Sequence, residues 1–290
     1  MVELIRSTSE FKMRRETFTT QKVGLVPTMG NLHQGHLSLV QACVNDNDVT
    51  IVSIFVNPKQ FGPHEDFNRY PRTLEQDLEL LSSVVKGRPC LIYAPNSPHD
   101  IYPQGFDTTI SLGALSKPLC GKFRPGHFDG VATVVHRLFS ITRPSTAYFG
   151  TKDFQQLAII KRMVLDLDIP IKIIPMPIIR DQDGLALSSR NQYLSKEERQ
   201  LALKLPTTLT RICHLFRECH HNAAAPKLIN FIEKSLSESL AEQQVEWQYL
   251  EILDSLTLMV PSSATSEWVI AGAMKVGKTR LIDNITLATS

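Results

Sequence analysis

The feature that most constrains the fold is the stretch from Val23 to His36, which reads VGLVPTMGNLHQGH. Its first four residues, 23–26, are apolar and rich in valine, a pattern that predicts a buried strand. A proline, a glycine and an asparagine then break the strand. From His36 onward, apolar residues recur at helical spacing. The stretch therefore predicts a strand, a tight loop and a helix in direct succession.

Two histidines stand where that helix is expected to begin, in the pattern His33-x-Gly35-His36. Free N–H groups and the positive end of the helix dipole make a helix N-terminus suitable for binding phosphate. Imidazole N–H groups can donate to phosphate oxygens, and Gly35 lets a ligand approach the backbone closely. The same residues also fit a metal-binding pair or two ordinary surface histidines, so the motif alone leaves three interpretations open.

Strands and helices alternate along the chain to about residue 179. Residues 1–22 fit a short strand and a polar helix, and the Pro- and Gly-rich residues 95–126 fit loops with short strands. The other predicted segments are a strand at 48–56, a helix at 73–86, a strand at 90–94, a helix at 127–141, a strand at 147–150, a helix at 154–167 and a strand region at 169–179. This order predicts an α/β fold with a doubly wound, mostly parallel sheet. Ligands bind beyond the carboxyl ends of such strands, here in the loops after Val26, Val56, Phe149 and Ile179.

The character of the sequence changes after that point. Residues 195–221 fit a long helix that is broken or kinked near Pro206, and residues 225–243 fit a second helix. Residues 245–253, 268–276 and 280–286 fit strands. We therefore expect two domains, a larger one at 1–179 and a smaller α+β domain at 180–290.

The composition excludes several classes of protein. The 31 Lys and Arg residues nearly balance the 29 Asp and Glu residues, so the net charge of +2 gives no electrostatic footprint for nucleic acid. No apolar run approaches the length of a membrane span, and the N-terminal sequence has no signal-peptide core. The five cysteines are odd in number and scattered. We therefore expect a reduced, cytoplasmic protein with neither membrane nor nucleic acid as its partner.

Two further motifs carry groups suited to phosphate. Ser188, Ser189 and Arg190 place two hydroxyls and a guanidinium in one turn, and the arginine can bind phosphate in bidentate fashion. Lys152 can also bind phosphate, and Asp153 can supply the single carboxylate that Mg²⁺ often takes beside phosphate oxygens. Each motif has a plain alternative, since Ser-Ser-Arg and a lone aspartate both occur at helix N-caps.

Taken together, the motifs resemble the pantothenate synthetase (pantoate–β-alanine ligase) family of the nucleotidylyltransferase superfamily. The resemblance is carried by PTMGNL at 27–32 before the histidine motif, GTKDFQQ at 150–156 and GLALSSRN at 184–191. It extends to 57–62, 70–73, 121–131 and 280–284, in order and at compatible spacing. The departures from the family pattern are Leu187 for methionine, Thr151 for glutamate, Phe154 for tyrosine and Cys120 for glutamate.

The resemblance implies roles for individual residues. The catalytic residues it implies are His33, His36, Lys152 and Arg190. The residues it implies for ATP are Met29, Gly30, His33, His36, Gly150, Lys152, Asp153, Ile179, Leu187, Ser188, Ser189 and Arg190. Those for pantoate are Pro27, Met29, Gln60, Phe61, Tyr70, Arg124, His127 and Gln156. Asp153 is the implied metal ligand, for Mg²⁺, with contact to the ribose as the other role open to it.

The resemblance also implies a reaction and an assembly. A Rossmann-like domain would bind ATP and pantoate, and the pantoate carboxylate would attack the α-phosphorus to give pantoyl adenylate and pyrophosphate. The amine of β-alanine would then displace AMP and form pantothenate, within a homodimer. Two alternatives stay open at this point: another nucleotidylyltransferase or adenylate-forming ligase acting on a different small acid, and a nucleotide-binding regulatory or RNA-binding module.

Two patterns invite other interpretations. The sequence GAMKVGKT at 272–279 satisfies the P-loop pattern letter for letter, but the residues after it alternate like a strand, so we interpret it as a hairpin turn. Cys213-His214 and Cys219-His220-His221 include zinc-ligand residue types. Their spacing matches no common zinc motif, and a helix would spread them over several faces. We therefore interpret them as helix-surface residues.

Overall fold

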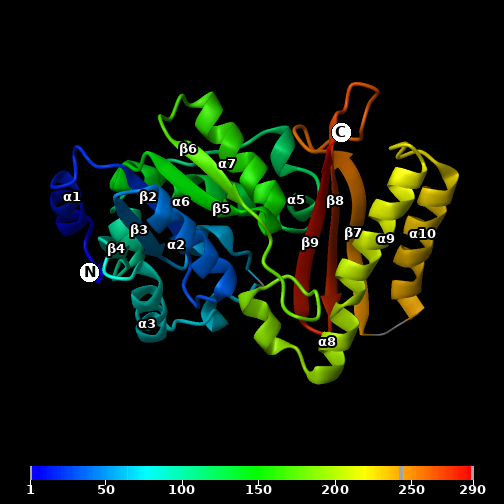
Figure 1. Cartoon of the computed structure of the whole chain (residues 1–290), viewed down its shortest axis with the longest axis horizontal. Helices are drawn as coiled ribbons and strands as arrows, with labels where there is room; N and C mark the ends of the chain where they lie inside the picture. The colour runs from blue at the N-terminus through cyan, green and yellow to red at the C-terminus, as the bar shows by residue number, and fades with distance from the viewer. Residues whose placement is uncertain (1, 64, 242–243, 289–290) are drawn as a thin grey trace. The chain divides into compact units, whose positions relative to one another are not determined.

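The computed structural model describes residues 2–63, 65–241 and 244–288 (Figure 1). The chain divides into two compact units, each with a sheet of its own. The first unit comprises Met1–Ser116, Arg124–Thr151 and Ile159–Pro177. The second comprises Lys117–Phe123, Lys152–Ala158 and Ile178–Ser290. Two short segments from the range expected for the larger domain, 117–123 and 152–158, thus belong to the second unit.

The first unit is built on six parallel strands in the order β1-β4-β3-β2-β5-β6. The strands are β1 (Val2–Ile5), β2 (Val23–Thr28), β3 (Val49–Ile54), β4 (Cys90–Tyr93), β5 (Thr146–Gly150) and β6 (Lys172–Met176). The order reverses between β2 and β5, because β3 and β4 follow on one side of β2 and β6 on the far side of β5. Ligands bind outside the carboxyl ends of strands at such a switch point. The predicted α/β fold with a doubly wound parallel sheet is confirmed.

Helices cover both faces of this sheet, as its nearly continuous apolar strands require (Figure 1). On one face, α2 (Gln34–Asp46) and α3 (Leu74–Val85) share a core with Val26, Val52 and Ile92. On the other face, Phe11 of α1 (Thr8–Glu16) contacts the Tyr93 ring, with centroids 4.7 Å apart. There α1 packs beside α6 (His127–Thr142). Helix α7 (Phe154–Asp166) begins in the second unit and ends in the first.

The expectation of short strands at 95–126 is wrong. All of these residues are described, and they form loops with the short helices α4 (Pro98–Ile101), η3 (Ala114–Ser116) and α5 (Cys120–Phe123). Local chemistry explains α4: the Ser97 side chain accepts from the His99 N–H, and the Asp100 carboxylate accepts from the Ser97 N–H. This capping box, with proline in the first helical position, begins a helix where composition indicated only a loop.

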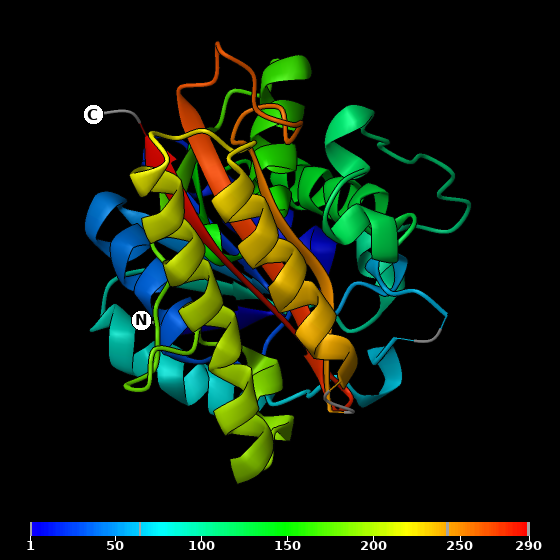
Figure 2. The same cartoon turned by 90° about the vertical axis from the view of Figure 1, so that its right-hand side faces the viewer.

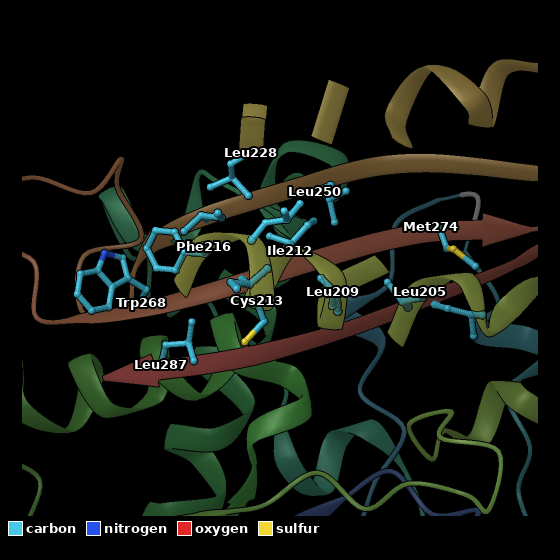
Figure 3. Packing of buried hydrophobic residues seen from close by; sticks show 14 of the residues in the cluster. Leu205, Leu209, Ile212, Cys213, Phe216, Leu228, Leu250, Trp268, Met274 and Leu287 are labelled. Carbon is cyan, nitrogen blue, oxygen red and sulfur yellow. The ribbon is translucent and has the colours of Figure 1, made fainter. Parts of the chain in front are cut away.

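The second unit pairs an antiparallel sheet with helices (Figure 2). Its strands are β7 (Val245–Asp254), β8 (Glu267–Val276) and β9 (Thr279–Ala288), which confirms the three predicted strands. Helices α9 (Lys204–Glu218) and α10 (Pro226–Ala241) run side by side against the sheet. Figure 3 shows the buried side chains between these layers, among them Leu209, Phe216 and Ile212. This unit is the α+β part of the fold.

The helix expected at 195–221 differs in detail. It divides at Leu203 into α8 (Lys196–Ala202) and α9, and Pro206 lies in the first turn of α9, where a proline removes no intrahelical hydrogen bond. Helix α9 ends at Glu218, because His220 and His221 take left-handed φ angles of 51° and 59°. The helix expected at 225–243 corresponds to α10, and residues 242–243 lie outside the described residues.

The P-loop-like sequence and the cysteine and histidine cluster both have structural explanations. The P-loop-like sequence spans β8 and the turn into β9, with Val276 paired to Thr279 and Gly277 at φ 55°, so the hairpin interpretation is confirmed. Of the cysteine and histidine cluster, Cys213 is buried in the core, and the His221 ring stacks on Trp268 with centroids 5.0 Å apart. These two are packing residues, so placing all of the cluster on a helix surface was wrong. No described helix is both long and apolar enough to cross a membrane.

Candidate active site

The loop between β2 and α2 has a backbone that only certain residues tolerate. Gly30 and Asn31 lie at φ 83° and 51°, in the left-handed region that favours glycine and admits asparagine. A Cβ atom added to Gly30 would stand 3.0 Å from Asp77 Oδ2 and 3.0 Å from the Ile54 side chain. The Thr28 hydroxyl accepts from the Gly30 N–H at 3.2 Å. The conformation of this loop is therefore tightly specified by what surrounds it.

A buried carboxylate anchors the same loop. Asp77 of α3 is 1% exposed; its Oδ1 accepts from the Leu32 N–H at 2.7 Å and its Oδ2 from the Asn31 N–H at 3.0 Å. Burial raises the pKa of the Asp77 carboxyl above its usual value, although the hydrogen bonds from Leu32 and Asn31 act in the opposite direction. Asp77 thus holds two consecutive N–H groups directly before His33.

The two histidines form a reciprocal cap at the start of α2. His33 Nδ1 accepts from the Gly35 N–H at 3.1 Å, and His36 Nδ1 accepts from the His33 N–H at 3.4 Å. The ring centroids are 4.1 Å apart. Because both Nδ1 atoms are acceptors, each neutral ring carries its proton on Nε2, which becomes a donor. Two N–H donors at a helix N-terminus, beside the carboxyl end of β2, suit a phosphate group.

The loop after β3 carries Gln60 in a short turn, η1 (Pro58–Gln60). Asn57 holds this turn: its Oδ1 accepts from the Tyr102 hydroxyl at 2.8 Å, and its Nδ2 donates to Gln60 Oε1 at 3.1 Å. The Gln60 amide oxygen is thereby engaged, and its Nε2 lies 3.1 Å from Met29 Sδ. The structure therefore brings together Gln60 and Met29 from the loops of two neighbouring strands.

Apolar and basic side chains stand around Gln60. The Phe61 ring contacts Tyr70, with centroids 6.0 Å apart, and Pro27 lies half-buried in β2. His127, the first residue of α6, has Nδ1 2.7 Å from the Gln60 carbonyl oxygen. Arg124 Nη1 lies 2.9 Å from His127 Nε2. The candidate pantoate residues of the first unit therefore form one connected neighbourhood at the carboxyl ends of β2 and β3.

Gly150 ends β5 at the switch point of the sheet, and the chain passes from it into η4 (Thr151–Asp153). An added Cβ at Gly150 would meet nothing within 4 Å, so this backbone is open to approach.

In the second unit, two neighbouring glutamines at the start of α7, Gln155 and Gln156, have different environments. Gln155 is buried; its Oε1 accepts from the Cys120 N–H at 3.0 Å and its Nε2 donates to the Pro118 carbonyl at 2.7 Å. Gln156 is half-exposed, Asp153 is exposed, and the Lys152 carbonyl accepts from Asn284 Nδ2 at 3.0 Å. Gln155 is therefore committed to packing, whereas Gln156 stays accessible for a ligand.

The serine–arginine motif forms the start of η5 (Ser189–Tyr193). Ser188 caps it, because its hydroxyl accepts from the Arg190 N–H at 3.3 Å. Just before, the Leu187 N–H donates to the Ile179 carbonyl at 2.9 Å, so these two residues lie opposite each other at the base of one loop. The structure thus brings together all five candidate ATP residues of this region, Ile179, Leu187, Ser188, Ser189 and Arg190.

Cys120, one of the four residues expected to depart from the family pattern, lies in a polar cluster of the second unit. Its Sγ is 3.2 Å from the Tyr249 hydroxyl and 3.3 Å from Arg280 Nη2. Arg280 also donates to Gln248 Oε1 at 2.6 Å. A thiol therefore lies beside a guanidinium in this cluster.

The comparison with known families decides between the interpretations. Residues 3–286 match the family described as pantoate-beta-alanine ligase. The chain belongs to this family. It is an enzyme that ligates pantoate to β-alanine, in pantothenate biosynthesis. The predicted family and function are confirmed.

Relatives and solved structures agree with this assignment. A pantothenate synthetase of Sulfurihydrogenibium sp. (strain YO3AOP1) is 49% identical over 265 residues, which cover 91% of this chain and 92% of the relative. The crystal structure of pantothenate synthetase from Thermus thermophilus matches with a TM-score of 0.86 at 40% identity, covering 98% of each chain. The pantoate-beta-alanine ligase from Francisella tularensis, described as complexed with "Beta-gamma ATP and Beta-alanine", matches with a TM-score of 0.74 at 35% identity, covering 98% of this chain and 97% of that chain.

Two carboxylates that hold candidate site residues in place were not predicted from the sequence: Asp77, which binds the histidine loop, and Glu65, which binds Arg124. Asp77 gave a signal: it lies four and eight residues before Leu81 and Val85, on the buried stripe of α3. An acidic residue on a buried stripe needs a partner, and here the partner is the histidine loop. Glu65 gave no such signal, since it lies in an irregular segment between η1 and η2 (Phe67–Arg69).

Proposed function

We propose that this ligase activates pantoate as pantoyl adenylate at the expense of ATP. A pantoate carboxylate oxygen bonds to the α-phosphorus as the bond to pyrophosphate breaks. The β-alanine nitrogen then bonds to the activated carbonyl carbon, loses a proton, and releases AMP. The observation that carries this proposal is the reciprocal cap of His33 and His36 at the start of α2, beside the switch point, in which both Nδ1 atoms accept and the Nε2 atoms are left to donate.

For the first unit, we propose that the β2–α2 loop and the end of β5 bind the nucleotide. His33 and His36 donate to phosphate oxygens and stabilise the charge that develops as pyrophosphate leaves, which makes them catalytic residues. Met29, Gly30 and Gly150 contact the nucleotide, which approaches the backbone closely and packs against it there. The narrow fit of Gly30 against Asp77 and the open backbone at Gly150 support this assignment.

We propose that pantoate is held by polar groups at its carboxylate and hydroxyls and by apolar groups at its dimethyl centre. In the first unit, the amide of Gln60 donates to the acid, and Pro27, Met29, Phe61 and Tyr70 pack against the methyl groups, with Arg124 and His127 beside them. In the second unit, Gln156 supplies another amide. The accessible side chain of Gln156, next to the fully engaged Gln155, supports this choice.

For the second unit, we propose that Lys152 and Arg190 bind the triphosphate as catalytic residues and that Ser188 and Ser189 donate hydroxyl hydrogen bonds to it. Lysine supplies a point charge and arginine a bidentate fork, so the two bind different phosphate oxygens. Ile179 and Leu187 would pack against the nucleotide. Their pairing across one loop supports a shared role.

The donor set fits Mg²⁺ bound as part of the nucleotide complex. Asp153 is exposed at the end of η4, and no group of three potential metal ligands occurs among the described residues. Mg²⁺ usually takes one or two carboxylates and completes its shell with phosphate oxygens and water. Asp153 would hold the ion, which when bound neutralises phosphate charge, and a contact of Asp153 with the ribose remains its other proposed role.

We propose that the functional domains are 1–179, which binds ATP and pantoate, and 180–290, a smaller lid domain. We also propose a homodimer, on the family resemblance, and a cytoplasmic location. The near-neutral charge and the absence of any disulfide among the five cysteines support a reducing compartment and no nucleic-acid partner.

The order of chemistry can be tested by isotope exchange. Given ATP, Mg²⁺ and pantoate without β-alanine, the enzyme is expected to exchange labelled pyrophosphate into ATP, because attack on the α-phosphorus is reversible until the amine arrives. The measurement is label in ATP after separation from pyrophosphate. Omission of pantoate is the control and should abolish the exchange.

Two outcomes of this exchange experiment would contradict the mechanism. Release of ADP and phosphate would mean that the acid is phosphorylated instead of adenylated. Exchange that requires β-alanine would point to a concerted ternary step without a free adenylate.

The anchoring of the histidine loop by Asp77 gives a prediction for Asp77→Asn. An asparagine can accept from only one of the two N–H groups and presents an NH₂ to the other, so kcat/KM for ATP is expected to fall about tenfold. The melting temperature of Asp77→Asn should change little. The raised pKa means that the ionised carboxyl costs folding free energy once the pH exceeds its unfolded pKa, and asparagine removes that cost.

Glu79→Gln is the matched control for Asp77→Asn, because Glu79 is an exposed carboxylate on the same helix. It should leave both the kinetics and the melting temperature unchanged. Unaltered ATP kinetics in Asp77→Asn, with the fold preserved, would show that the loop does not need its anchor.

A further inference from the structure

The main chain of Gln60 is held by a line of three side chains that begins at a carboxylate. His127 Nδ1 lies 2.7 Å from the Gln60 carbonyl oxygen, and Arg124 Nη1 lies 2.9 Å from His127 Nε2. Arg124 in turn donates from Nε to Glu65 Oε1 at 2.7 Å and from Nη2 to Glu65 Oε2 at 2.5 Å. Its Nη2 also donates to the Gln60 carbonyl oxygen, at 3.4 Å. All four residues belong to the first unit.

The partners of His127 fix its tautomer. A carbonyl oxygen only accepts, so Nδ1 must carry a proton to bind Gln60. A guanidinium only donates, so Nε2 must offer a lone pair to Arg124. The two requirements agree on one neutral form, protonated at Nδ1, and this is the opposite tautomer to that of His33 and His36. Any other form of the ring would place donor against donor or acceptor against acceptor.

Glu65 holds the guanidinium in the orientation that this tautomer needs. The contact is bidentate, which fixes the plane of the guanidinium as well as its position. Burial raises the pKa of the Glu65 carboxyl, but the surrounding groups, with the hydrogen bond and charge of Arg124 foremost, together outweigh burial, and the net pKa is lowered. Glu65 is therefore ionised at neutral pH and keeps Arg124 fully engaged on one side.

The side chain of Gln60 is oriented from its other end. Asn57 Nδ2 donates to Gln60 Oε1, and the Tyr102 hydroxyl in turn fixes Asn57 through Oδ1. The amide is thereby turned so that its NH₂ group, rather than its oxygen, lies near Met29. With the main chain held by His127 and the amide by Asn57, Gln60 has little freedom to rotate.

We propose that Glu65 is a positioning residue for the acid substrate, acting through Arg124 and His127 on Gln60. This inference rests on the proposed role of Gln60 in binding pantoate. It assigns Arg124 and His127 a supporting function, because Arg124 already makes two hydrogen bonds to Glu65, one to His127 and a longer one, at 3.4 Å, to the Gln60 carbonyl oxygen. Glu65 touches no substrate; it keeps the amide of Gln60 where the acid binds.

Glu65→Gln tests the proposal, because glutamine keeps the size of the side chain but offers one acceptor and an NH₂ group to the guanidinium. The expected result is a rise in KM for pantoate of about tenfold, the equivalent of one hydrogen bond to a charged group, with KM for ATP within about twofold. In ¹⁵N spectra of the histidine-labelled enzyme, His127 should lose its preference for the Nδ1-protonated form. His127→Gln assigns its signals among the nine histidines.

Glu3→Gln is the matched control. Glu3 also binds an arginine with both carboxylate oxygens, which share the Nε–H of Arg14 at 3.0 and 2.8 Å, but it does so between β1 and α1, away from this network. It should change neither KM nor the spectrum of His127. Arg124→Lys, which keeps the charge and loses the fork, should raise KM for pantoate as Glu65→Gln does, and provides a second variant if one folds poorly.

An unchanged KM for pantoate together with an unchanged His127 tautomer in Glu65→Gln would overturn the proposal. So would equal rises in KM for pantoate and ATP, since they would indicate general damage. Failure of the underlying function looks different. If Gln60→Ala leaves KM for pantoate unaltered while Glu65→Gln still shifts the His127 tautomer, the network is real and the substrate assignment of Gln60 is wrong.

Discussion

Replacing His36 by alanine is expected to leave the enzyme folded and to slow adenylation by roughly 10²–10³-fold, the usual effect of removing one preorganised donor from a developing negative charge. The reason is the fixed tautomer: His36 Nδ1 accepts from the His33 N–H, which leaves the proton on Nε2. The measurement is pantoate-dependent exchange of pyrophosphate into ATP, which isolates the first half-reaction. Near wild-type exchange in the purified variant would refute the role of His36.

His33 requires a pair of variants, because its ring also caps α2. His33→Ala should lose a similar factor in exchange, and in addition about 1 kcal/mol of stability through loss of the cap. His33→Asn supplies a good N-cap in its place, so it should recover the stability without recovering the exchange. If His33→Asn restored exchange as well, the contribution of His33 would be helix capping alone, and a phosphate contact would be unnecessary.

The sequence predicts the frame of the first unit well because its signals are local. The apolar run at 23–26, the breakers after it and the helical spacing from His36 each act within a few residues, and the structure reproduces them as β2, the loop and α2. The same holds for the hairpin at 277–278, where strand alternation on both sides outweighs a chance match to the P-loop pattern. Patterns of period 2 and 3.6 are visible without knowledge of the tertiary structure.

The supporting contacts were beyond prediction because they join residues far apart in the chain. Asp77 binds the Leu32 N–H across 45 positions, and Arg124 binds Glu65 across 59. Asp77 is marked only by its place on the buried stripe of α3, which does not identify its partner, and Glu65 is not marked by composition or spacing at all. Likewise, the sequence offers both Gln155 and Gln156 as amides that could bind a ligand. Only the structure shows that Gln155 is engaged within the protein, through its hydrogen bonds with Cys120 and Pro118. The roles of the candidate residues themselves stay predictions until variants are measured.

The close packing of α6 against the Gln60 turn gives the last prediction, for Gly130→Ala. A Cβ atom at Gly130 would overlap the Lys59 carbonyl and stand 2.8 Å from the Gln60 N atom. The Gly130 carbonyl also accepts from Asn57 Nδ2 at 3.1 Å, so helix and turn cannot separate without losing that hydrogen bond. The methyl group must displace the turn that carries Gln60, since helix backbone yields less readily than a short turn.

A displacement of about 1 Å at a binding group can cost roughly 10²-fold, so kcat/KM for pantoate in Gly130→Ala is expected to fall by about that factor. Overpacking should also lower the free energy of unfolding by about 1–3 kcal/mol. Gly113→Ala is the control, because an added Cβ there meets nothing within 4 Å and its φ is ordinary. KM for ATP should move little in either variant, since the histidine loop is anchored separately by Asp77. A Gly130→Ala enzyme with normal pantoate kinetics would mean that the position of the Gln60 turn does not control binding of the acid.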